Sequence, residues 1–113
     1  MATLIGSWVA YDWYTTRPIP FERAAWLEGE KSDGSDVRHR MADWLVESSH
    51  LRGKTRAEVV SLLGPVTDTD KFREFDMVYV LGMERGWMSI DHEWLLLSLD
   101  REGRVSADRV TSD

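Results

Sequence analysis

The segment Leu51–Val66 constrains the fold more than any other stretch, because it specifies the start, one face and the end of a single helix. Thr55 and Glu58 have the spacing of a capping box, in which each side chain bonds the backbone N–H of the other residue. Apolar residues then recur at three- and four-residue spacing, at Val59, Leu62 and Leu63. The pair Gly64-Pro65 stops the pattern. We therefore predict a short helix with one apolar face that a second layer must cover.

Two further helices are predicted ahead of this one. Residues 21–30 form a short helix whose apolar side carries Phe21, Ala25 and Trp26. The next helix begins at Ser35 or Asp36 and ends near residues 48–50. Its apolar stripe consists of Val37, Met41, Trp44 and Leu45. The polar residues expected off this stripe are Arg38, His39, Arg40, Asp43 and Glu47.

Downstream of Pro65, alternating apolar residues predict an antiparallel sheet. The first strand spans Phe75–Leu81, and one of its faces carries Phe75, Met77, Tyr79 and Leu81. The second spans Glu93–Asp100, with Leu95, Leu97 and Leu99 on one face and Trp94, Leu96 and Ser98 on the other. Because both faces carry large apolar residues, both should be covered in part. A turn at Asp100–Gly103 leads into the last strand, Val105–Val110.

Helices followed by a meander of strands indicate an α+β fold in which two helices pack on an antiparallel sheet of three or four strands. The chain of 113 residues is the right length for one such domain. We place the domain at residues 21–113, with residues 1–20 as an N-terminal arm that ends in a rigid Arg17-Pro18-Ile19-Pro20 connection. The arm is aromatic at Trp8, Tyr11, Trp13 and Tyr14. It is expected to pack on its own domain or to dock on a second copy, which would give a homodimer.

Composition narrows the partners and the chemistry. A net charge of −6 argues against nucleic-acid binding, which needs a basic face. Acidic residues outnumber basic ones 11 to 6 from Ser61 onward, which is typical of a solvated acidic surface and also compatible with a basic protein partner. The absence of cysteine excludes disulfides, thiolate catalysis and cysteine-based zinc sites. The first apolar run, interrupted at Asp12, is too short for membrane insertion and lacks the basic start of a signal peptide. A cytoplasmic location is favoured, or a periplasmic one if a signal segment has been removed.

No catalytic motif stands out. The histidines His39, His50 and His92 lack metalloprotease spacing, and there is no nucleophile elbow or phosphate-binding glycine loop. The one dense polar cluster is Asp91-His92-Glu93. In a strand, His92 would face away from its two acidic neighbours, whereas in a turn the three side chains would converge on a metal. The sequence therefore predicts no catalytic residue, cofactor or metal. A small metal-binding domain or enzyme centred on this cluster is the alternative.

The pattern G-x-T-x-x-E-V-x-x-L-L-G runs from Gly53 to Gly64 and is followed by Val78-Tyr79, Trp94–Leu97, Asp100 and Gly103–Val105. With these residues, the stretch from Arg40 to Val110 resembles the BamE (SmpA/OmlA) family of small outer-membrane assembly lipoproteins. The resemblance implies two helices packed on a three-stranded antiparallel sheet, a shape shared with β-lactamase-inhibitor-like proteins. It also implies protein binding without catalysis, in envelope assembly or as an inhibitor or immunity-type protein. The sequence lacks the lipidated cysteine and signal peptide of the family.

Aromatic and charged residues gather around the second predicted strand. Tryptophan and tyrosine are enriched at protein interfaces and dominate their binding energy. We predict that a protein partner is bound by Tyr79, Trp87, Asp91, His92 and Trp94, with Trp87 the most exposed of them. For Tyr79 and Trp94 the alternative is burial beneath the helices. The predicted function is a non-enzymatic protein-interaction module, with a self-associating structural domain as a further alternative.

Overall fold

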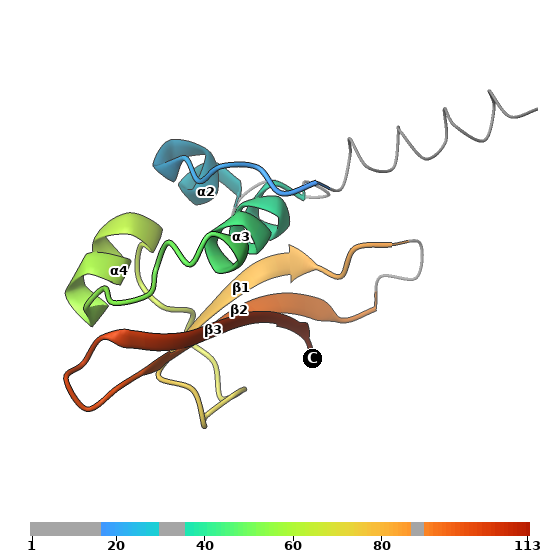
Figure 1. Ribbon diagram of the computed structural model, residues 1–113. Coiled ribbons are helices and arrows are strands. Elements are labelled where there is room, and N and C mark those ends of the chain that lie inside the picture. The colour runs from blue at the N-terminus through green and yellow to red at the C-terminus, as the bar shows by residue number, and fades with distance from the viewer. Residues whose placement is uncertain (1–16, 30–35, 87–89) are drawn as a thin grey trace, which may run out of the picture.

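A computed structural model describes residues 17–29, 36–86 and 90–113 of the chain. Their elements are α2 (Arg23–Gly29), α3 (Val37–Glu47), α4 (Arg56–Leu63), β1 (Met77–Met83), β2 (His92–Leu99) and β3 (Val105–Ser112). The strands form one antiparallel sheet in the order β1-β2-β3. The helices lie together over one face of this sheet (Figure 1). The predicted α+β fold is confirmed, and the short helix predicted at residues 21–30 is present as α2, which joins α3 and α4 in the helical layer.

The helix α4 begins and ends where its sequence requires. The Thr55 hydroxyl accepts a hydrogen bond from the Glu58 N–H (3.2 Å), and the Glu58 carboxylate accepts one from the Thr55 N–H (3.0 Å). This reciprocal pair satisfies two donors that the first turn of a helix leaves free. At the other end Gly64 has a φ of 84°, which few residues other than glycine adopt.

The helix α3 buries two residues that its periodicity places off the apolar stripe. Arg38 donates from Nε to the Trp26 carbonyl (2.8 Å) and from Nη1 to the Val80 carbonyl (3.1 Å). His39 is equally buried. The prediction that both lie off the buried face was wrong, because long polar side chains can be buried once backbone carbonyls accept their hydrogen bonds. Trp44, predicted on the stripe, is only half-buried.

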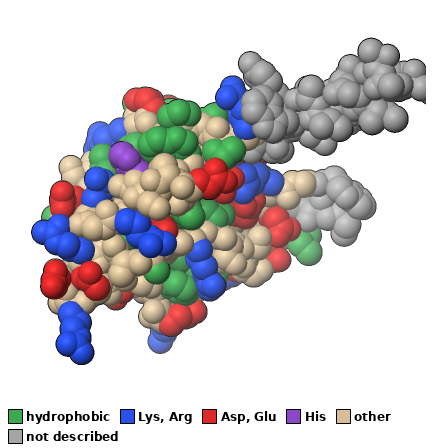
Figure 2. Space-filling model, in the orientation of Figure 1, with side chains coloured by type: hydrophobic (Ala, Val, Ile, Leu, Met, Phe, Trp, Pro, Cys, Tyr) green, Lys and Arg blue, Asp and Glu red, His purple; other side chains and the backbone are tan. Residues whose placement is uncertain are grey.

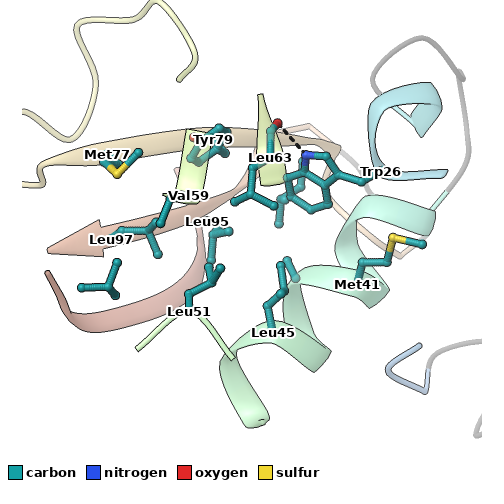
Figure 3. Packing of buried hydrophobic residues seen from close by; sticks show 13 residues of the cluster. Trp26, Met41, Leu45, Leu51, Val59, Leu63, Met77, Tyr79, Leu95 and Leu97 are labelled. Carbon is teal, nitrogen blue, oxygen red and sulfur yellow. Dashed lines mark hydrogen bonds between the residues drawn. The ribbon is translucent and has the colours of Figure 1, made fainter. Parts of the chain in front are cut away.

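The main core lies between the helices and the sheet and includes Trp26, which is fully buried (Figure 3). The Trp26 indole N–H donates to the Leu63 carbonyl (3.0 Å), and the Tyr79 hydroxyl donates to the Gly64 carbonyl (2.9 Å). Both bonds satisfy carbonyls at the end of α4, which have no partner within the helix. Burial raises the pKa of Tyr79 to about 12. The two aromatic residues therefore tie α2, α4 and β1 together.

A second, smaller apolar cluster covers the opposite face of the sheet. It consists of Val78, Trp94 and Leu96, with Phe72, Phe75 and Val80 packed against them. The alternation of β2 is confirmed, since Trp94 and Leu96 face this cluster while Leu95 and Leu97 face the helices. The position of Phe75 was predicted wrongly. It precedes β1 in a turn and packs on the far face instead of beside Met77.

Replacing Thr55 with alanine tests the capping box. The substitution removes the acceptor for the Glu58 N–H, so the free energy of unfolding should fall by about 1 kcal/mol. Urea denaturation should show a lower midpoint with an unchanged slope. The matched variant Thr55→Ser keeps the hydroxyl and should retain most of the stability. Equal losses in both variants would contradict the role of the cap.

Candidate functional site

The candidate site lies at the end of the sheet where β1 leaves it and β2 enters. We call residues 82–86 and 90–93 the hairpin end. Here Met83 pairs with His92, and the Glu84 N–H donates to the Asp91 carbonyl (2.8 Å). The register of β1 against β2 shifts between Val80 and Gly82. Strand β1 ends at Met83, two residues beyond its predicted end. The bulge re-aims the last residues of β1, as bulges beside functional sites commonly do.

On the helix side, Arg85 joins the hairpin end to α3. Its Nη2 donates to the Glu93 carboxylate (2.8 Å) and its Nη1 to the Asp43 carboxylate (2.8 Å). Glu93 is 7% exposed. Burial acts to raise the pKa of Glu93, but the hydrogen bonds from Arg85 outweigh it, and the net pKa is lowered. Glu93 is therefore held as a carboxylate. The Arg85 guanidinium links its own segment, which follows β1, to Glu93 of β2 and to Asp43 of α3.

His39 adds a second link between α3 and the hairpin end. Its Nε2 lies 2.8 Å from the Met83 carbonyl, and because a carbonyl only accepts, this nitrogen carries the proton. The same nitrogen lies 3.7 Å from the Glu93 carboxylate. Gly82 packs directly against the ring: a side chain there would come within 3.0 Å of His39 Cε1, and its φ of 140° also requires glycine.

On the far side of the sheet, the hairpin end borders a hollow of about 270 Å³. The hollow is lined by Thr67, Asp68, Thr69, Lys71, Val80, His92, Trp94 and Asp113. Lys71 forms an ion pair with Asp113, whose carboxylate also accepts from the His92 N–H (2.8 Å). These hydrogen bonds, first that from Lys71, lower the pKa of Asp113 to about 2. Six of the eight lining residues are polar, and Val80 and Trp94 are the two apolar ones.

Two large apolar side chains at the hairpin end are exposed. Ile90 is 77% exposed and Met83 is 48% exposed. Because cross-strand partners share a face, Met83 points to the same side of the sheet as His92 and the hollow. Figure 2 shows acidic and hydrophobic side chains next to one another at this end of the sheet. The hairpin end thus combines apolar anchors with carboxylates.

The structure separates the predicted partner-binding residues. His92 is exposed and Asp91 is half-buried, both at the hairpin end. Trp94 is only 5% exposed; it lines the hollow and packs against Phe72, with ring centroids 5.6 Å apart. Tyr79 belongs to the core beneath the helices, because its hydroxyl bonds α4, and it offers no exposed surface to a partner. Trp87 lies outside the described residues.

Four residues that shape this site were not predicted as part of it from the sequence, namely Asp43, Lys71, Arg85 and Asp113. Asp43 pairs with Arg85 and Lys71 pairs with Asp113, in both cases across 42 residues of the chain. The cross-strand pairing of Met83 with His92, in contrast, could have been found by aligning the two strands. The pairing of Arg85 with Glu93 spans a short connection and was within reach of the same reasoning.

The metal-binding alternative at Asp91-His92-Glu93 receives no support from the geometry. Glu93 faces the helices and Arg85, whereas His92 lines the hollow on the opposite side. Among residues 17–29, 36–86 and 90–113, no three histidine, cysteine or acidic side chains are grouped as metal ligands. Over the same residues, no helix is long and apolar enough to cross a membrane.

Comparison of the chain with protein-family models, with curated proteins and with solved structures found no match. The resemblance to the BamE family therefore stays a prediction from the sequence, and the function must be inferred from the residues of the chain itself.

Replacing Glu93 with glutamine tests the ion-pair cluster. Loss of the carboxylate leaves the Arg85 guanidinium with one partner fewer, which should cost about 2–4 kcal/mol of unfolding free energy at pH 7. Because the pKa of Glu93 is lowered from its ordinary value of 4.5, its contribution is complete above pH 4.5 and is lost as the pH falls through the lower folded value. The gap between wild type and Glu93→Gln should therefore narrow at low pH.

Urea denaturation from pH 7 to pH 3 measures this gap, with the exposed turn residue Glu102→Gln as the control. A gap below about 0.5 kcal/mol at pH 7, as expected for an ordinary surface substitution, would show that the cluster contributes nothing.

Proposed function

We propose that the protein is a non-enzymatic interaction module that binds a protein partner at the hairpin end. The observation that carries the proposal is the exposure of Ile90 and Met83 on a segment that is otherwise tightly held. A flexible loop commonly exposes apolar residues, but here the flanking backbone is bonded to α3 through Arg85 and His39. Such a preorganised apolar surface loses little conformational entropy on binding, which favours an interaction role.

The charges around the hairpin end favour a partner with basic groups. Asp68 lines the hollow, and Asp91 lies in the hairpin end. Neither carboxylate forms a salt bridge with a described basic residue. The nearby cations are already paired, Lys71 with Asp113 and Arg73 with Asp70. A partner that presents one or two apolar side chains flanked by lysine or arginine therefore complements this surface.

The biological setting follows from the family resemblance of residues 40–110. In that reading the module acts in envelope assembly, as BamE-like proteins do. The β-lactamase-inhibitor-like shape gives the other setting, in which the module inhibits or neutralises an enzyme or toxin. Both settings use protein binding without chemistry, and the identity of the partner separates them.

Affinity capture with matched variants tests the proposal. Ile90→Asp and Met83→Asp remove an apolar anchor and add a charge that opposes insertion into a partner, so each should reduce capture at least about tenfold. Val60→Asp, at a 37% exposed apolar position on α4, is the control and should capture as wild type does. The readout is quantitative mass spectrometry of proteins captured from native lysate, with the melting temperature of each variant measured in parallel.

The proposal requires one stoichiometric partner whose capture depends on Ile90 and Met83 but not on Val60. Equal capture by all variants would place the binding surface elsewhere. Failure of wild type to capture any protein, from soluble and membrane fractions alike, would contradict the interaction role itself.

A further inference from the structure

The two edges of the sheet differ in how their backbone groups are satisfied. At β1 the Thr67 N–H donates to the Val78 carbonyl (2.9 Å), and the Thr67 hydroxyl accepts from the Val80 N–H (2.9 Å). Arg38 donates to the Val80 carbonyl from the same side (3.1 Å). Side chains and a loop thus cover the groups that a free edge strand would offer to another chain.

At β3 only the first residue is covered in this way. Val105 donates to the Lys54 carbonyl (2.8 Å) and accepts from the Gly53 N–H (2.9 Å). Further along, the Asp113 N–H donates to the His92 carbonyl, so Asp113 faces β2. Since backbone groups alternate in direction along a strand, those of Asp108, Val110 and Ser112 point outward. Among the described residues, the one bond to these outward groups is that of the neighbouring Thr111 hydroxyl, which donates to the Ser112 carbonyl (3.4 Å), and no other segment covers them. Figure 1 shows β3 at the front of the sheet with no helix or strand before its C-terminal half.

We propose that this open edge pairs with the same edge of a second copy, antiparallel, around a two-fold axis at Val110. Val110 is the middle of the three residues with outward groups, so an axis at Val110 is the one that pairs all three. In this register Val110 lies opposite Val110 of the second copy, and Asp108 lies opposite Ser112 of the second copy. An isologous contact of this kind is the commonest way in which identical chains associate. Pairing of exposed strand edges supplies its hydrogen bonds.

The side chains agree with this register. It places Arg109 opposite Thr111 of the second copy, whereas an axis at Arg109 would place two arginines face to face, which destabilises a strand pair. Val110 would meet its own copy beside the main core, against which it already packs. Asp108 has a buried carboxylate in which Oδ1 accepts from Arg52 (3.1 Å) and Oδ2 has no donor among the described residues. The register places a serine hydroxyl, a hydrogen-bond donor, opposite this carboxylate.

Pairing in this way would join two three-stranded sheets into one of six strands. A two-fold axis perpendicular to the sheet keeps the helices of both copies on one face and both hollows on the other. The two hairpin ends would then be presented by one rigid body. This dimer uses β3, in contrast to the arm-mediated homodimer that the sequence offers as one of two alternatives; residues 1–16 of that arm lie outside the described residues.

Because the chain contains no cysteine, single cysteine variants report the register directly. Arg109→Cys and Thr111→Cys are mixed under mild oxidation; in the proposed register the two positions form a directly opposed pair with Cα atoms about 4.5 Å apart, which suits a disulfide. The mixed disulfide should form at least about tenfold faster than one between either variant and Arg101→Cys, an exposed turn position, because prior association raises the effective concentration.

Sedimentation equilibrium of the wild-type protein supplies the second measurement. We expect a reversible monomer–dimer equilibrium, with the amides of Asp108, Val110 and Ser112 protected from hydrogen exchange only at concentrations where the dimer forms. A monomer at every concentration would overturn the proposal, as would protection of these amides in the monomer, which would mean that the chain covers its own edge. Mixed disulfides no faster than the Arg101→Cys control would overturn the register.

Discussion

Burial of β2 on both of its faces is the constraint on which the rest of the structure depends. Leu95 and Leu97 need a helical layer above them, and Trp94 and Leu96 need a cover below. Apolar side chains on both faces of one strand are stabilised only when both faces are shielded from water, so both covers are required. The helices supply the first and the segment with Phe72 and Phe75 supplies the second. The other elements take their positions because apolar side chains on both faces of β2 have to be covered.

The same strand begins at a place where apolar burial gives way to polar contacts. At Glu93 the helix-facing side of β2 meets Arg85, Asp43 and His39 instead of leucines. Buried ion pairs contribute less to stability than a well-packed apolar cluster of the same volume, but they fix geometry. The hairpin end is thereby positioned without burying its own apolar residues, and Met83 and Ile90 stay available for a partner. The proposed function rests on this separation of roles: Arg85 and His39 anchor the hairpin end, and a different pair of residues is exposed to a partner.

How much could be predicted from the sequence depends on whether a signal is local. The helix α4 was predicted with its cap and its end, because Thr55, Glu58 and Gly64 act within one short segment. The alternation of β2 was equally readable, since it reports both faces of one strand. Phe75 was misplaced because alternation continues into the turn before β1, where the chain no longer has strand geometry.

The site was less predictable because its contacts join distant segments. Arg85 meets Asp43 across 42 residues, and nothing in the periodicity of α3 marks Arg38 or His39 as buried. A stripe of apolar residues predicts which face a helix buries, but it does not register polar groups that find acceptors in other elements. Tyr79 shows the converse: its residue type suggests an interface, whereas its bond to Gly64 places it in the core.

The central claim is that the hairpin end is a preorganised surface held to α3, and native-state hydrogen exchange tests it most directly. The amides to follow are those of Glu84, which bonds the Asp91 carbonyl, and Arg85, which bonds the Glu93 carboxylate. If the claim is right, both amides exchange with a free energy close to that of global unfolding, as core strands do. Exchange at nearly unprotected rates, with a free energy near zero, would show that the hairpin end frays independently of α3 and would contradict the claim.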